Sequence, residues 1–178
     1  MSRRTALSGI TGAAATAVLS RLFHAEGSSV IGRENTELVI IHCAFTPRTH
    51  DIGVAEIDQW HRQKGWLSCG YHYVIRRDGQ IEIGRELMVA GAHAIGFNNK
   101  SVGVCLVGGA SADLKRYENN FEDDQMDSLE AVLRHIIEVW PDLVVAGHCD
   151  VADKRCPGFD VQKWAESKGF STQQHQSG

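Results

Sequence analysis

Three side chains that can bind a transition metal stand close to predicted core strands. His42 follows a short apolar run at residues 38–41, His148 follows a second run at 144–147, and Cys156 comes eight residues later. Strand ends bring residues that are distant in sequence to a common rim of a sheet. Two imidazoles and one thiolate at such a rim leave a fourth tetrahedral position open for water, which is typical of a catalytic rather than a structural zinc site.

The spacing of these residues leaves other interpretations open. The chain has nine histidines, and a histidine at a strand end also serves as a hydrogen-bonded core or surface residue. No compact His-x-x-x-His or Cys-x-x-Cys pattern marks a metal site. Cys156 could instead be the nucleophile of a cysteine hydrolase, which a chelator would leave active. Cys43 and Cys149 are expected to point away from any metal bound by their neighbours, because successive residues of a strand face opposite sides.

Length and composition narrow the class of protein. The 178 residues are enough for one domain with its own core, and a net charge of -4 disfavours a non-specific nucleic-acid binder. The five cysteines are odd in number and widely spaced, so they do not form a disulfide framework.

The N-terminal extension, residues 1–30, differs from the rest of the chain. Paired arginines at positions 3 and 4 precede an apolar stretch rich in alanine, glycine and threonine at 6–19. This order resembles a secretory signal of the twin-arginine type, although Ala6 is not bulky and Phe23 stands where a cleavage site needs a small residue. An uncleaved signal-anchor with transient membrane association and a poorly ordered arm are the alternatives.

Residues 36–170 carry the pattern of a single α/β domain, a central mixed β-sheet flanked by helices. Apolar runs predict strands, the Asp78-Gly79 pair predicts a hairpin, and 3.6-residue periodicity predicts helices. The expected strands are 38–41, 71–76, 80–85, 101–107 and 144–147, and the expected helices are 54–64, 122–140 and 161–168. The four tryptophans are expected in the core, and the Ser/Gln-rich residues 171–178 are expected to be a disordered tail.

Several stretches, in order and with matching spacing from about 38 to 164, carry a family resemblance. They are Ile-His-Cys at 41–43, Ile-Asp-Gln-Trp-His at 57–61, Gly-Trp-Leu at 65–67, Gly-Tyr-His-Tyr at 70–73, Arg-Asp-Gly at 77–79, Ala-His-Ala at 92–94, and the segments 102–109 and 148–160. The sequence resembles the zinc amidases related to peptidoglycan recognition proteins, a family that includes short lysozymes of podovirus-type phages. The resemblance implies an α/β domain with one zinc ion at the sheet rim. It also implies hydrolysis of the bond between N-acetylmuramic acid and L-alanine.

The resemblance also assigns roles to residues of the same type in this chain. It implies that His42, His148 and Cys156 hold the zinc, and that Tyr71 and Lys154 take part in catalysis. We hypothesise that the Lys154 ammonium lies near the developing oxyanion and that Tyr71 orients water or relays a proton. Three further residues are candidates for substrate contact: His93, His72 and Asn98.

The implied partner is bacterial peptidoglycan, bound by a monomer that is made in the bacterial cytoplasm and acts in the periplasm or cell wall. Two other classes compete with the enzyme. Non-catalytic wall-binding relatives typically lack the cysteine ligand, whereas Cys156 is present here. The other alternative is regulation of a phage RNA polymerase, known in the family, which is disfavoured because the segment before about residue 34 is dissimilar.

Overall fold

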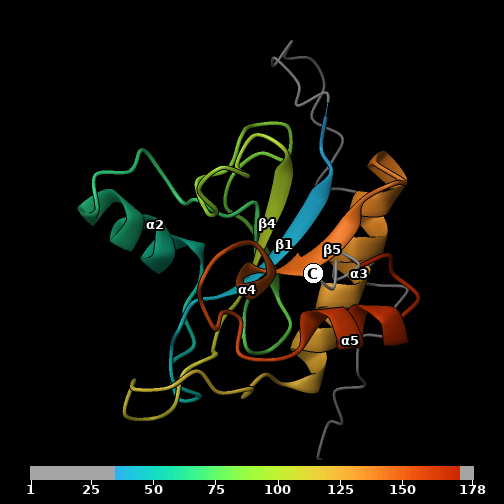
Figure 1. Ribbon diagram of the computed structural model, residues 1–178. Helices are drawn as coiled ribbons and strands as arrows, with labels where there is room; N and C mark the ends of the chain where they lie inside the picture. Colours follow the sequence, from blue (N-terminus) through green and yellow to red (C-terminus); the bar gives the residue numbers. More distant parts are fainter. Residues whose placement is uncertain (1–34, 173–178) are drawn as a thin grey trace, which may run out of the picture.

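The computed structural model describes residues 35–172, which form a five-stranded sheet in the order β3-β2-β4-β1-β5 (Figure 1). The strands are β1 Leu38–Cys43, β2 Tyr73–Ile75, β3 Ile81–Ile83, β4 Ser101–Leu106 and β5 Val144–Gly147. Only β3 runs antiparallel to its neighbour, so the sheet is mixed, as predicted. The predicted N-terminal extension, residues 1–30, lies outside the described residues.

Helices cover both faces of the sheet, and Figure 1 shows α3 and α5 on one side and α2 on the other. Their bounds are α2 Val54–Gln63, α3 Asp123–Val139, α4 His148–Val151 and α5 Val161–Ser167. The three predicted helices are confirmed, whereas α4 was not predicted, because four residues are too few to show helical periodicity. Within residues 35–172, no helix is long and apolar enough to cross a membrane.

Side chains alternate between the two faces of the sheet along β1, so one face is apolar and the other carries the candidate metal ligand His42. Val39 and Ile41 pack in the main core, where α3 contributes Leu133. Ile40 belongs to a separate small cluster. His42 is two residues further along β1 and therefore lies on the same face as Ile40. Because successive side chains of a strand point to opposite faces, His42 lies on the face away from α3.

Gln125 ties α3 to the sheet. Its side chain is fully buried, and its amide nitrogen donates to the carbonyl oxygens of Ile75 at 3.2 Å and Val107 at 2.9 Å. Its amide oxygen accepts the backbone N–H of Glu122 at 3.1 Å. These bonds add to the Val107 N–H and Arg77 donors that the same two carbonyls already accept, and they fix the start of α3 against the ends of β2 and β4.

The predicted hairpin at Asp78-Gly79 joins β2 and β3, although each strand is shorter than expected, with three residues. Gly79 has a φ of +81°, and a Cβ atom there would lie 2.7 Å from the carbonyl oxygen of Asp124. Only glycine fits this left-handed position against α3 without strain.

Two predictions need correction at the periphery. Ser171 and Thr172, which were assigned to the disordered tail, pair with β5: the Ser171 carbonyl accepts the Val145 N–H at 2.8 Å. The rest of that tail, 173–178, lies outside the described residues. Trp60 and Trp66 are 38% and 39% exposed rather than core residues, whereas Trp140 and Trp164 pack against the main core as predicted.

Candidate metal centre and active site

The parallel pairing of β1 with β5 places two histidines side by side. Ile41 pairs with Gly147, so His42, the next residue of β1, lies beside His148, the first residue of α4 directly after β5. Their ring centroids lie 4.4 Å apart. Cys156 follows on the loop from α4 to α5, and ligand atoms of His42, His148 and Cys156 all lie within 4.8 Å of one another. The structure thus brings together the three side chains for which a metal site was expected.

The donor set of this cluster fits zinc. Bonds of about 2.0–2.3 Å in a tetrahedral zinc site separate neighbouring ligand atoms by about 3.4–3.6 Å, and the ligand atoms here all lie within 4.8 Å of one another. All three side chains are buried. Burial, together with the nearby His93, His148 and Lys154, holds the pKa of His42 well below its usual value. His42 is therefore a neutral imidazole near pH 7, the form that binds a metal.

Cys156 lies against Cys43, which was expected to point away from the site. The Cys43 backbone N–H donates to the Cys156 Sγ atom at 3.3 Å, and the two sulfur atoms are 3.8 Å apart. The Cys43 thiol and burial raise the pKa of Cys156. The Cys156 thiol must therefore release its proton when it binds a metal. Cys43 is not among the three clustered ligands, as expected, but its thiol contacts the Cys156 sulfur instead of pointing away from it.

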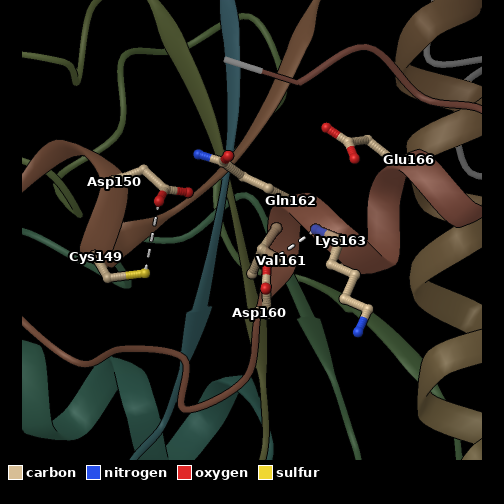
Figure 2. A pocket seen from close by; sticks show the side chains of 7 residues that line it. All are labelled: Cys149, Asp150, Asp160, Val161, Gln162, Lys163 and Glu166. Carbon is tan, nitrogen blue, oxygen red and sulfur yellow. Dashed lines mark hydrogen bonds between the residues drawn. The ribbon is translucent and has the colours of Figure 1, made fainter. Parts of the chain in front are cut away.

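Cys149 lies outside the cluster, as expected, but for a different reason. It belongs to α4 rather than to a strand, and it is exposed. Figure 2 shows Cys149 and Asp150 beside a separate hollow lined by the start of α5, with the Cys149 Sγ atom 3.9 Å from an Asp150 carboxylate oxygen. A helical turn, not strand alternation, therefore directs Cys149 away from His148.

Tyr71 packs beside the proposed ligands. Its ring centroid lies 5.1 Å from that of His42, and its side chain packs against the cluster that contains the buried Cys105. Burial and the surrounding thiols raise the pKa of Tyr71 well above its usual value. At neutral pH Tyr71 is therefore a phenol that can donate a hydrogen bond, rather than a phenolate.

Lys154 is exposed on the short loop between α4 and Cys156, where its backbone N–H donates to the Ala152 carbonyl at 2.8 Å. Its positive charge is one of the causes that lower the pKa of His42. The exposed Lys154 side chain therefore adds positive charge near His42.

His61 belongs to the same group of rings, although the sequence identified it only as a helical residue. Its ring lies 5.4 Å from Tyr71 and 4.5 Å from Trp66, measured between centroids. Its Nδ1 atom accepts the Gly70 N–H at 2.9 Å. The signal in the sequence was a histidine four residues after Ile57, on the buried face of α2.

Two of the residues predicted to contact substrate, His72 and Asn98, hydrogen-bond the backbone of this chain. His72 is fully buried; its Nδ1 atom accepts the Gly103 N–H, and its Nε2 atom bonds the Val89 carbonyl, both at 2.9 Å. The Asn98 side-chain oxygen accepts the backbone N–H groups of His93 and Ala94 at 2.8 and 2.9 Å. These bonds hold the loop before β4, and they use both ring nitrogens of His72 and the side-chain oxygen of Asn98.

His93, the third such residue, lies against a proposed ligand. Its Nδ1 atom is 3.0 Å from the Nε2 atom of His42, and the two rings are nearly perpendicular, at 82°. The His93 side chain is buried, with 9% of the residue exposed. The structure therefore places the His93 ring directly against that of His42.

Comparisons with known proteins agree with this geometry. Residues 32–159 match the family model described as N-acetylmuramoyl-L-alanine amidase. The chain is 43% identical to the endolysin of Escherichia phage T7 over 140 residues, which cover 79% of this chain and 92% of that one. It is 44% identical to the endolysin of Klebsiella phage KP32 over 143 residues, covering 80% and 94% of the two chains.

Solved structures show the same fold. The amidase LysC from Clostridium intestinale superposes with a TM-score of 0.66 at 26% identity, covering 78% of this chain and 89% of that one. Drosophila PGRP-LB gives a TM-score of 0.66 at 26% identity, covering 80% and 86%. Sequence and fold together show that this chain belongs to the N-acetylmuramoyl-L-alanine amidase family.

Proposed function

We propose that this chain is an endolysin that hydrolyses the amide bond between N-acetylmuramic acid and the L-alanine of the peptidoglycan stem peptide, with one zinc ion. Membership of the amidase family and the phage endolysins among its relatives support the reaction and the substrate. The observation that carries the zinc assignment is the buried cluster of His42, His148 and Cys156, whose ligand atoms lie within 4.8 Å of one another.

The three proposed ligands have complementary tasks. When bound, zinc supplies a Lewis acid that polarises the amide carbonyl and lowers the pKa of a water molecule to about 7. His42 and His148 offer neutral donor atoms, while the Cys156 thiolate contributes one negative charge. The Cys43 N–H, which points at the Cys156 sulfur, stabilises that charge.

Tyr71 and Lys154 are proposed to act on the reacting groups. A neutral Tyr71 donates its hydroxyl proton in a hydrogen bond and so orients the attacking water or assists the leaving amine. The Lys154 ammonium stabilises negative charge as it develops on the carbonyl oxygen. Its exposed position leaves it free to approach a substrate that arrives from solvent.

The site of action follows from the substrate. Peptidoglycan lies outside the cytoplasmic membrane, so the enzyme acts on the cell wall. We propose that residues 1–30 assist export or transient membrane association, which the described residues do not address. Comparing wall lysis by cells that express the full chain with lysis by cells expressing residues 31–178 would test this role.

The reaction is tested by analysing the products released from purified peptidoglycan. We expect new L-alanine amino termini and intact glycan chains, with activity lost on chelation and restored by zinc. Cys156→Ser should abolish release, because a hydroxyl is a poor substitute for a thiolate ligand. Unchanged release after chelation would favour a cysteine hydrolase, and wall binding without release would favour a binding module.

Tyr71→Phe removes only the hydroxyl and keeps the packed ring. We expect kcat to fall by about 10²- to 10⁴-fold, the usual contribution of a positioned proton donor. Zinc content, measured by elemental analysis, should stay at the wild-type level. Wild-type kcat in this variant would show that Tyr71 is a packing residue.

Lys154→Ala is expected to lower kcat by about 10²-fold, since it removes one charge from the oxyanion. Lys163→Ala is a matched control, because Lys163 is a lysine of α5 that lines the separate hollow beside Cys149. Steady-state kinetics on soluble wall fragments would compare the two variants. Equal activity of both variants and the wild type would remove Lys154 from the mechanism.

A further inference from the structure

The His42 imidazole uses one ring nitrogen for His93 and has the other left for a metal. Its Nε2 atom lies 3.0 Å from the Nδ1 atom of His93, and both side chains are buried. A hydrogen bond between two imidazoles needs one N–H and one lone pair. If His42 binds zinc through Nδ1, its proton must be on Nε2, and His93 must accept that proton through Nδ1.

The loop that carries His93 is fixed by bonds of its own. The Asn98 side-chain oxygen holds the backbone N–H groups of His93 and Ala94. The Gly91 N–H donates to the Asn98 carbonyl at 3.2 Å. The backbone on both sides of His93 is therefore tied to one residue, and little freedom remains for the ring to swing away from His42.

Two glycines leave the space that the His93 ring fills. A Cβ atom at Gly103, in β4, would lie 2.6 Å from the ring, and one at Gly91 would lie 2.4 Å from it. Real Cβ contacts are not this short, so any side chain at either position would displace His93. On its far side the ring neighbours His72, with centroids 5.7 Å apart, and backbone bonds immobilise His72.

We propose that His93 is a positioning residue for the metal ligand His42: it accepts the His42 Nε2–H and so fixes the tautomer and ring orientation that present Nδ1 to zinc. This inference rests on the proposed zinc site. Hydrogen bonds from a ligand's second nitrogen typically account for about 10- to 100-fold in metal affinity. This role differs from the substrate contact that the sequence suggested for His93, because only the positioning role changes zinc affinity.

The test is the zinc affinity of the full chain, measured by competition with a chromogenic chelator. His93→Leu fills the space but cannot accept a proton, and we expect it to weaken zinc binding by about 10- to 100-fold. His93→Asn keeps an acceptor, because Oδ1 takes the place of Nδ1, and it should recover most of the affinity. His50→Leu, at an exposed loop histidine, is the control and should bind zinc like the wild type.

Gly103→Ala tests the same contact from the opposite side, since its Cβ would push the ring away from His42. We expect weaker zinc binding here too, although the His93 side chain is retained. Circular dichroism of the metal-free variants shows whether each one folds; if His93→Leu does not, the comparison of His93→Asn with Gly103→Ala decides.

Three outcomes would overturn the inference. Zinc affinity of His93→Leu equal to that of the wild type would show that the bond does not position His42. Equal losses in His93→Leu and His93→Asn would indicate packing alone. A raised KM at saturating zinc with unchanged zinc affinity would restore the role in substrate contact. Failure of the wild type itself to bind zinc would instead contradict the proposed function.

Discussion

The parallel pairing of β1 with β5 is the constraint on which the rest of the site depends. It sets His42 beside His148 at the ends of two buried strands, although more than a hundred residues separate them in the chain. Burying two imidazoles among apolar side chains is unfavourable unless they are hydrogen-bonded or bind a metal. The same burial keeps His42 neutral. The sheet therefore provides both the positions of the proposed ligands and the protonation state of His42.

One face of the sheet forms the main hydrophobic core, and the other face carries the candidate active site. The face toward α3 and α5 is filled with apolar side chains, and the buried side chains of Gln125 and Arg77 both donate to the Val107 carbonyl near the strand ends. The opposite face carries the rings of His42, Tyr71 and His93, each close to at least one of the others. A substitution on the chemical face can therefore change metal binding or catalysis while the larger core stays intact.

Much of this arrangement could be predicted from the sequence, and the failures share a cause. Apolar runs and helical periodicity are local signals, so the strand before His42 and the long helix α3 were predicted to within a few residues. The contact of Cys43 with Cys156 and the bond of His93 to His42 depend on the paths of loops, and no local pattern records them. The half-exposed Trp66 was placed in the core because its hydrophobicity says nothing about which face of the fold it occupies.

The family resemblance was most informative for the metal site, because the spacing of His42, His148 and Cys156 alone did not identify one. The pattern of strand ends left a metal site, hydrogen-bonded histidines and a cysteine nucleophile all open. The structure favours the first, because it brings ligand atoms of His42, His148 and Cys156 together in one buried cluster.

X-ray absorption spectroscopy at the zinc edge of the purified protein would test this metal site directly. The account predicts one sulfur at about 2.3 Å and two imidazole nitrogens at about 2.0–2.1 Å. A shell without sulfur, or one with two sulfurs that includes Cys43, would contradict it.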